Sequence, residues 1–207
     1  MMNRILFIAF ATLSMMAVGC GNGNKPVNTD AVHHAPQADY YVAVTGNDEN
    51  DGISENSAFA TLQEAILNAE EGNIIEVLPG TYTGEGNTEV ELLGKKITLL
   101  SQGGPEATTI DCEGLGRAFH IHEGETPETV LDGFTILNGV APMGTYGIND
   151  YEMSYGGGIF VDGANPTLRN LTIRDCEAGL GGGLTLRYSN THVSDVRIET
   201  NSATYFG

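Results

Sequence analysis

Hydrophobic and polar residues alternate along most of the C-terminal half of the chain. In Leu171-Thr172-Ile173-Arg174 and again in Val196-Arg197-Ile198-Glu199, every second residue is apolar. A period of two predicts β-strands that bury one face. The two segments belong to a longer repeat of 25 residues, which also relates Ile159 to Leu184, Val161 to Leu186, Leu168 to Val193, Asn165 to Asn190 and Ala178 to Ala203.

This repeat predicts a solenoid of stacked strands. Each unit holds two expected strands, at about 158–161 and 167–174, joined by a turn-forming run over 162–166. A unit of this size cannot bury its apolar side alone, so successive units must stack on one another. Strands that repeat at a fixed interval and stack on copies of themselves form a parallel β-helix, so we expect an all-β fold of this class.

Glycine triplets begin at Gly156 and again at Gly181, at the same interval of 25 residues. We expect each triplet to mark a corner of the coil, where the backbone needs a positive φ or leaves no room for a Cβ. A phosphate-binding loop is the alternative, but no Gly-Lys-Ser/Thr sequence follows either triplet.

The pattern continues towards the N-terminus with looser spacing. Leu131, Phe134 and Ile136 match Leu168, Leu171 and Ile173 at an offset of 37 residues, and 118–122 resembles 158–162. We therefore expect roughly four or five coils, with 118–207 forming the repeating part. The chain stops inside a repeat at Gly207, and we expect further C-terminal coils to be missing from this sequence.

A single amphipathic helix is expected near the start of the solenoid. Thr61-Leu62-Gln63-Glu64 forms a capping box, and apolar residues follow at helical spacing until Gly72. We expect a helix at about 61–70 that covers the open edge of the first coil. Residues 40–117 would then form this N-terminal cap and the first coils.

The first residues predict export. Arg4 precedes an apolar run from Ile5 to Val18, which is too short to span a membrane, and Ala17-Val18-Gly19-Cys20 follows. The last four resemble a bacterial lipobox, which implies that residues 1–19 are a signal peptide and that Cys20 carries lipid. Gly21 after the cysteine fits sorting to the outer membrane and cell surface. An ordinary signal peptide with a chance cysteine is the alternative, and residues 20–39 are expected to be a flexible tether.

The segment from Tyr40 to Gly84 resembles the opening of many secreted parallel β-helix proteins. The shared pattern is a Tyr-Val strand, a Gly-x-Asp-x-Asn-Asp-Gly turn at 46–52, Phe-Ala-Thr-x-Gln-x-Ala-Ile at 59–66, and Pro-Gly-Thr-Tyr at 79–82. With the later coils, the chain is similar to the pectate-lyase-like superfamily of right-handed parallel β-helices. The resemblance implies the fold but not the activity, because this superfamily includes lyases, glycoside hydrolases and adhesins.

Two classes of function follow from this resemblance. One is a non-catalytic surface protein that binds polysaccharide or another surface partner. The other is a polysaccharide lyase of the pectate-lyase type, or a glycoside hydrolase. Such a lyase removes a proton next to a uronate carboxylate, which Ca²⁺ or cationic side chains neutralise, and uses an unpaired Arg or Lys as the base.

The net charge excludes one class of partner. The chain has 27 acidic and 9 basic side chains, and removing residues 1–19 removes Arg4 and leaves 8 basic ones. An acidic surface repels nucleic acid, so we expect no nucleic-acid partner. The only expected contact with a membrane is the lipid on Cys20, and the sequence leaves the oligomeric state open.

Most arginines find an acidic partner when the repeats are stacked. The offsets place Arg187 over Asp162, Arg174 under Glu199 and Arg169 over Asp132, which predicts a ladder of ion pairs worth about 0–1 kcal/mol each. Arg197 stacks over Thr172 and Thr135 with no visible acid, which makes it the candidate catalytic base. Lys95 and Lys96 precede a strand, and we expect both to face solvent at a turn.

One coil is 12 residues longer than its successor, which is the difference between the offsets of 37 and 25, and the extra length lies between Gly139 and Tyr155. This insertion is the candidate binding site. Insertions in solenoids form loops on one face, and aromatic and amide side chains are typical of sugar-binding loops. Its candidate substrate-binding residues are Tyr146, Asn149, Asp150, Tyr151, Glu152 and Tyr155. An ordinary surface loop is the alternative.

Metal binding and disulfide formation stay open at this stage. Asp48, Asn50 and Asp51 offer oxygen ligands for Ca²⁺, the one possible cofactor, but hydrogen-bonded Asx turns explain them equally well. His120 and His122 project from one strand face and could begin a metal site, although no third ligand is evident. Cys112 and Cys176 could pair, but we expect small buried core residues instead.

Overall fold

The computed structural model describes residues 37–145 and 152–206. The predictions made for the signal peptide, Cys20 and most of the tether fall on residues outside these ranges. The same is true of four candidate binding residues in the insertion, namely Tyr146, Asn149, Asp150 and Tyr151.

Strands dominate the described residues, with one short α-helix, α1 (Leu62–Asn68), and a 3₁₀ turn, η1 (Glu55–Ser57). The strands are β1 (Tyr40–Val42), β2 (Ile74–Val77), β3 (Gly80–Tyr82), β4 (Thr98–Ser101), β5 (Thr108–Asp111), β6 (Phe119–Ile121), β7 (Val130–Asp132), β8 (Thr135–Leu137), β9 (Gly144–Thr145), β10 (Glu152–Met153), β11 (Ile159–Asp162), β12 (Thr167–Arg174), β13 (Glu177–Leu180), β14 (Leu184–Arg187), β15 (His192–Glu199) and β16 (Ser202–Phe206).

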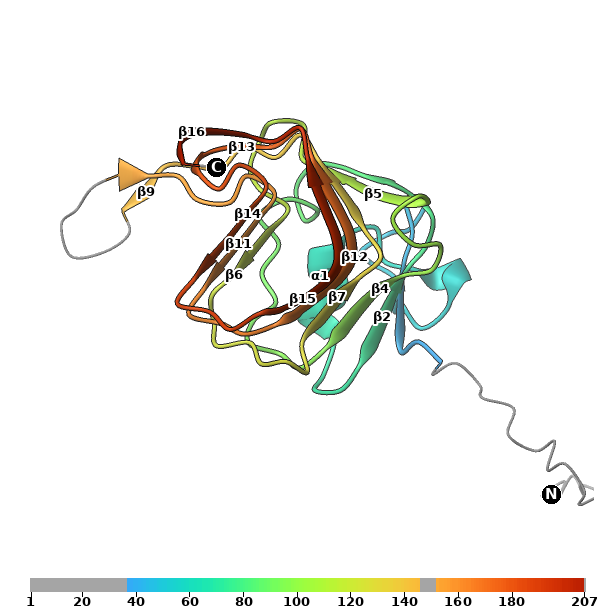
Figure 1. Cartoon of the computed structure of the whole chain (residues 1–207). Coiled ribbons are helices and arrows are strands. Elements are labelled where there is room, and N and C mark those ends of the chain that lie inside the picture. Colours follow the sequence, from blue (N-terminus) through green and yellow to red (C-terminus); the bar gives the residue numbers. More distant parts are fainter. Residues whose placement is uncertain (1–36, 146–151, 207) are drawn as a thin grey trace, which may run out of the picture. The chain divides into compact units, whose positions relative to one another are not determined.

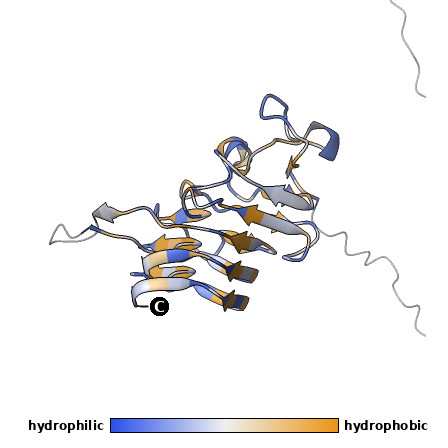
Figure 2. Cartoon of the chain, turned by 90° about the horizontal axis from the view of Figure 1, so that it is seen from above, coloured by the Kyte–Doolittle hydropathy of each residue, from blue (hydrophilic) through white to orange (hydrophobic). Residues whose placement is uncertain are grey.

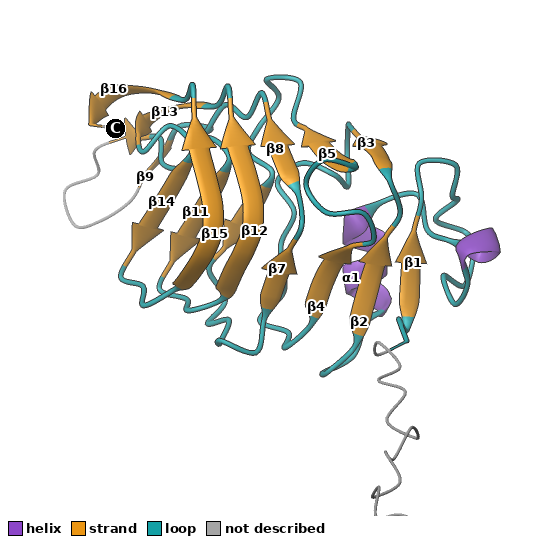
Figure 3. Cartoon of the chain, turned by 45° about the vertical axis from the view of Figure 1, so that its right-hand side comes forward, coloured by secondary structure: helices purple, strands orange, loops and turns teal. Residues whose placement is uncertain are grey.

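These strands stack as a parallel β-helix, as the repeat predicts (Figure 1). One ladder runs β1-β2-β4-β7-β12-β15, a second runs β3-β5-β8-β12, and a third runs β6-β11-β14. The strands of all three ladders pair in parallel, and Figure 3 shows the first ladder as successive levels along one axis. The first ladder has six levels, which is more than the four or five coils expected from the sequence.

The registers confirm both repeat offsets. Ile173 lies beside Ile136 on one side and Ile198 on the other, and Ile159 lies between Phe119 and Leu184. Like residues therefore stack inside the coil and form one buried core, seen as the hydrophobic colour on the strands in Figure 2. On β15 the side chain of Ile198 is 52% exposed, because no described strand lies over it.

The glycine triplets form corners for both of the expected reasons. Gly156 and Gly181 each have a φ of +58°, a region that favours glycine. Gly157 has no room for a Cβ, which would collide with the carbonyl oxygen of Gly182 in the next coil. A Cβ on Gly158 would lie 2.6 Å from Cγ2 of Ile173. The first glycine thus turns the chain, and the next two let adjacent coils approach.

Helix α1 covers the first coil, and its N-terminus agrees with the capping box. The Thr61 hydroxyl accepts a hydrogen bond from the Glu64 N–H, and Leu62, Ala65 and Ile66 are buried against the core. The helix ends at Asn68, before the expected position, and Gly72 lies in the turn that follows with a φ of +86°. No helix in the described ranges is long and apolar enough to cross a membrane.

The sequence prediction for Lys95 was wrong, and the early end of α1 explains where its side chain lies. Instead of facing solvent, its ammonium donates hydrogen bonds to the carbonyl oxygens of Ile66, Leu67 and Ala69 at 2.6, 3.0 and 2.8 Å. The last carbonyls of a helix lack intrahelical partners and carry partial negative charge, so a cation stabilises them. Lys96 is exposed, as expected.

Replacement of Lys95 tests this cap. We expect Lys95→Met to lower the free energy of unfolding by about 1–2 kcal/mol, because three charge-assisted hydrogen bonds are lost while the aliphatic stem is kept. Lys96→Met is the matched control and should change the free energy by less than about 0.5 kcal/mol. Urea denaturation measures both, and equal effects for the two variants would contradict the capping role.

The two described cysteines are small buried core residues, as predicted, and neither forms a disulfide. Burial raises the pKa of the Cys176 thiol to about 11 and raises the pKa of Cys112 well above its usual value. The Cys176 Sγ accepts a hydrogen bond from the Gly139 N–H at 3.3 Å, which places it in the backbone network of a corner.

Candidate functional site

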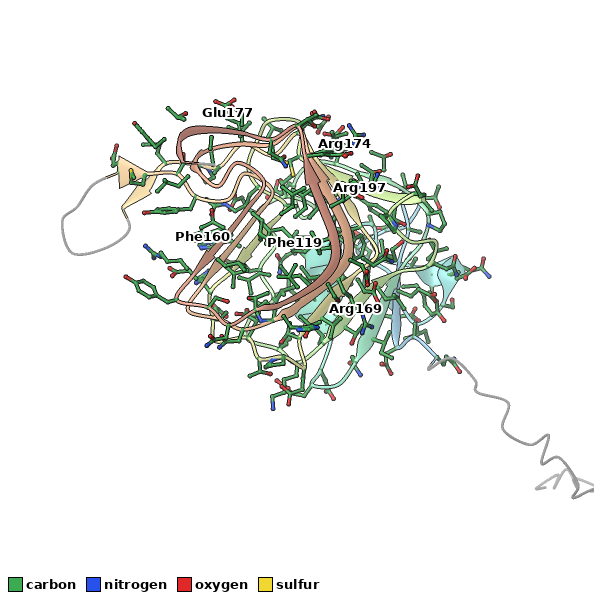
Figure 4. The ribbon with its side chains drawn as sticks, in the orientation of Figure 1. Phe119, Phe160, Arg169, Arg174, Glu177 and Arg197 are labelled. Carbon is green, nitrogen blue, oxygen red and sulfur yellow. The ribbon has the colours of Figure 1, made fainter. Side chains whose placement is uncertain are left out.

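The outward side of the β6-β11-β14 ladder carries a group of aromatic and charged side chains in contact with one another. Inward positions on these strands, such as Phe119 and Ile159, are buried in the core, so alternation turns His120 and Phe160 outward. Figure 4 shows Phe119 within the coil and Phe160 on the outer side of β11. We call the set His120, Tyr155, Phe160, Arg187 and Tyr188 the aromatic face.

Phe160 is the centre of the aromatic face. Its ring stacks on His120 with centroids 5.2 Å apart and on Tyr155 with centroids 5.3 Å apart. The guanidinium carbons of Arg117 and Arg187 lie 5.3 and 5.6 Å from the centre of the same ring. These neighbours leave Phe160 with no exposed surface, although it points away from the core. The face is therefore a packed layer outside the coil.

Arg187 links this layer to solvent. Its guanidinium lies 5.4 Å from the ring centre of Tyr155 and 5.5 Å from that of Tyr188, which is 85% exposed. The guanidinium also donates two hydrogen bonds to the Asp162 carboxylate, one of them at 2.8 Å. The hydrogen bond with Asp162 raises the pKa of Arg187, so this side chain stays charged. The result is a fixed cation in contact with two tyrosine rings.

The insertion begins and ends beside the aromatic face. Its ends pair as an antiparallel hairpin, β9 with β10, in which Glu152 lies opposite Thr145. Figure 1 shows this hairpin projecting from the coil on the side of β11 and β14. Tyr155, at the base of the insertion, bridges to Leu180 and joins the aromatic face, whereas Glu152 is exposed on the hairpin. Of the described candidate binding residues, Tyr155 therefore lies in the face and Glu152 beside it.

The ladder of ion pairs is confirmed at two of its three positions. Arg187 pairs with Asp162, and Arg169 pairs with Asp132 at 2.7 Å. The register does place Arg174 beside Glu199, but its guanidinium pairs with Asp175 at 2.6 Å. Asp175 is the next residue along the chain and sits at a corner with a φ of 56°, so it competes with Glu199 for the same cation.

Reversal of one charge tests the ladder. Asp162→Lys would place two cations about 4.8 Å apart on adjacent strands, and we expect a larger loss of stability at low salt than at high salt. Asp132→Lys, facing Arg169, should behave in the same way. Thermal unfolding at two salt concentrations measures both variants, and a salt-independent loss would mean that repulsion does not cause it.

The candidate catalytic base and the candidate calcium ligands lie far apart. Arg197 lies beside Thr172, as predicted, and forms no ion pair among the described residues. It comes from β15, at the opposite end of the first ladder from the turn after β1 that carries Asp48. Five interstrand steps of about 4.8 Å separate those levels by roughly 24 Å. Figure 4 places Arg197 on the β12–β15 side of the coil, away from Phe160.

The side chains of the candidate calcium ligands take part in turn hydrogen bonds. The Asp48 carboxylate accepts hydrogen bonds from the N–H groups of Ala60 and Thr61 and from the Thr61 hydroxyl. Asn50 donates its amide to the Ala58 carbonyl, and Asp51 accepts from the Ile53 N–H. The geometry favours the Asx-turn interpretation, in which these side chains hold the turn before α1.

His120 and His122 acquire a third neighbour that the sequence analysis did not find. The Glu91 carboxylate lies 3.4 Å from Nε2 of His122, and the ligating atoms of Glu91, His120 and His122 all lie within 4.8 Å of one another. A bridge between Val90 and Phe119 brings Glu91 beside His120. An offset of 29 residues, which aligns Val90-Glu91-Leu92 with Phe119-His120-Ile121, is the signal that could have found it.

Fold and site together define a parallel β-helix protein with an outward aromatic and cationic face and a neighbouring hairpin. Residues 44–205 match the model of a family described as protein of unknown function (DUF1565), and the chain belongs to that family. A search of curated proteins finds no match. A solved structure of a rhamnogalacturonan lyase is similar over 81% of this chain, with a TM-score of 0.43 and 16% identity. The chain spans about half of that lyase, 52% of its length.

Proposed function

We propose that this protein is a non-catalytic polysaccharide-binding protein and that the aromatic face is its binding surface. The observation that carries the proposal is the contact of both Tyr155 and Tyr188 with Arg187, with guanidinium-to-ring distances of 5.4 and 5.5 Å. Tyrosine rings present apolar faces that stack on the C–H face of a sugar ring. A guanidinium next to both rings donates hydrogen bonds in a fixed plane to hydroxyl or carboxylate oxygens.

Rigidity of the face supports binding. Arg187 is held by Asp162, and Tyr155 is held by stacking on Phe160, so both side chains lose little conformational entropy when a ligand arrives. The repeat adds an extended surface, since each coil places equivalent outward positions about 4.8 Å further along the axis. A long polymer can therefore lie along several coils and the adjoining hairpin.

The proposal includes attachment to the cell surface of a bacterium through lipid on Cys20. Its support is the sequence of residues 17–20 and the apolar run before it. Labelled fatty acid should be incorporated into the native chain and not into the Cys20→Ala variant. In cell fractionation, the native chain should be found with the membranes and the Cys20→Ala variant should not. Equal membrane association of the two proteins would overturn the anchor without affecting the binding surface.

Affinity electrophoresis in gels containing pectin, alginate, chondroitin or a neutral glucan tests the binding. We expect retardation by at least one polymer, and we expect Tyr188→Ala and Tyr155→Ala each to weaken it about tenfold, which corresponds to about 1.4 kcal/mol. Tyr41→Ala is the control, because Tyr41 lies on β1, at the opposite end of the first ladder from β15. No retardation, or equal retardation of all variants, would overturn the proposal.

A polysaccharide lyase that uses Arg197 as its base is the alternative, and one observation favours it: Arg197 has no acidic partner among the described residues. Incubation of the native protein with the same polymers should then raise the absorbance of unsaturated uronate, and Arg197→Ala should abolish that rise. Retardation without any rise would support the binding function.

A further inference from the structure

Three side chains that commonly bind transition metals converge at the edge of the aromatic face. They are Glu91, His120 and His122, and one ligating atom from each lies within 4.8 Å of those from the other two. Among the described residues, no other group of three or more His, Cys, Asp or Glu side chains has its ligating atoms this close together. The sequence prediction lacked a third ligand for the two histidines, and the fold supplies it.

The solenoid brings these residues together by stacking. Phe119 and Ile121 point into the core with no exposed surface, so His120 and His122 share the outward side of one strand and its extension. The bridge between Val90 and Phe119 puts Glu91 one level away, at the position beside His120. The two imidazole rings lie 4.1 Å apart between centroids. His120 therefore lies on strand β6, His122 directly follows that strand, and Glu91 follows the residue that bridges to it.

We propose that Glu91, His120 and His122 bind a divalent transition-metal ion, with Zn²⁺ as the first candidate. Two imidazoles and one carboxylate form a ligand set that suits Zn²⁺, Cu²⁺, Ni²⁺ or Co²⁺, whereas Ca²⁺ and Mg²⁺ prefer oxygen ligands throughout. Three protein ligands leave at least one coordination position for water or another oxygen ligand. This inference is independent of the proposed polysaccharide binding.

An unsatisfied atom gives independent support. Nε2 of His120 is buried and has no hydrogen-bond partner among the described residues. A buried polar atom without a partner costs about 1–3 kcal/mol, and a metal ion bound through this nitrogen would satisfy it.

The charged side chains around the site have opposing effects on the binding of a cation. Arg117 and Arg187 disfavour a second positive charge near His120, whereas Asp162 favours it. Arg117 is already paired with Glu89, and Arg187 with Asp162, so most of the two cationic charges is compensated locally. Glu91 adds a negative charge, and its side chain is 44% exposed. A chain with a net charge of −18 also raises the local concentration of cations.

Zinc titration by calorimetry tests the proposal on the full chain. His33→Ala and His34→Ala are introduced into every protein, so that these N-terminal histidines cannot contribute. We expect one Zn²⁺ per chain, and at least tenfold weaker binding for Glu91→Gln and for His122→Ala. His192→Ala is the matched control, because this exposed histidine lies on β15, and its affinity should equal that of the parent.

Two further measurements keep the outcome unambiguous. Co²⁺ in place of Zn²⁺ should give visible absorption typical of nitrogen and oxygen ligands, and the bands should be lost in Glu91→Gln/His122→Ala. Saturating Zn²⁺ should raise the melting temperature of the parent but not of this double variant. His122 and Glu91 are 34% and 44% exposed, so their replacement leaves the core intact even if His120→Ala fails to fold.

Parent-like Zn²⁺ affinity in Glu91→Gln/His122→Ala would overturn the proposal. It would also be overturned if the parent bound none of Zn²⁺, Co²⁺, Ni²⁺ and Cu²⁺ at micromolar concentrations. Ca²⁺ that competes with Zn²⁺ at the same site would exclude imidazole coordination and count against it as well.

Discussion

Gly157→Ala is expected to destabilise the protein by at least about 3 kcal/mol, although it adds only one methyl group. The new Cβ would collide with the Gly182 carbonyl oxygen and with the backbone of Glu177, which lies in the β13-β16 ladder. Backbone atoms in stacked strands cannot move aside as a flexible side chain would. The φ of Gly157 is not positive, so the loss would come from steric overlap alone.

Gly163→Ala is the matched control for this prediction. Gly163 has a φ of +68°, but a Cβ there would meet nothing within 4 Å, so the substitution adds backbone strain without overlap. We expect it to cost about 1 kcal/mol. Urea denaturation of both variants gives the comparison. If Gly163→Ala cost as much as Gly157→Ala, close approach of the coils would not be the reason for the glycine triplets.

Phe160→Ala is expected to cost about 3 kcal/mol, in the range typical of a buried phenylalanine. The side chain points away from the core, yet it has no exposed surface, because His120 and Tyr155 stack on its ring and two arginines cover it. Its removal should also weaken polysaccharide retardation, since Tyr155 and Arg187 lose the ring on which they rest. Denaturation and affinity electrophoresis of the same variant measure the two effects.

Tyr188→Ala separates the two roles of this layer. Tyr188 is 85% exposed, so its removal should change the free energy of unfolding by less than about 0.5 kcal/mol while it weakens retardation. A stability loss for Phe160→Ala no greater than that for Tyr188→Ala would show that the outer layer is not packed as described. Phe160→Leu should cost about 1 kcal/mol, because most of the buried volume is kept.

Much of the fold could be predicted because the repeat compares the chain with itself. An inward position such as Ile173 must match its neighbours in the coils before and after, and this constraint appears in the sequence as an offset of 25 or 37 residues. Strands without such alternation were missed: β13 and β16 lie at a corner and have no clear apolar period. Lys95 was mispredicted because its partners are the end carbonyls of α1, 26 to 29 residues earlier in the chain.

The candidate site could be predicted only in part. The insertion lies beside the aromatic face and Tyr155 belongs to that face, but the central Phe160 appears in the sequence as one more apolar residue of a strand. Arg197 lies beside Thr172, as the repeat predicts, and forms no ion pair within the described ranges, yet its distance from the candidate calcium ligands depends on the order of the strands.

The sequence by itself determined the parallel β-helix, the capping helix, the glycine corners and the pairing of Arg187 with Asp162, because each of these follows from residues that recur at a constant offset or lie close together in the chain. Only the tertiary structure decided which outward side chains meet across coils of unequal length. The level that carries Glu91 is related to that of His120 by an offset that occurs nowhere else in the repeat, and the packing of Arg117, His120 and Tyr155 around Phe160 depends on side-chain contacts that no spacing encodes.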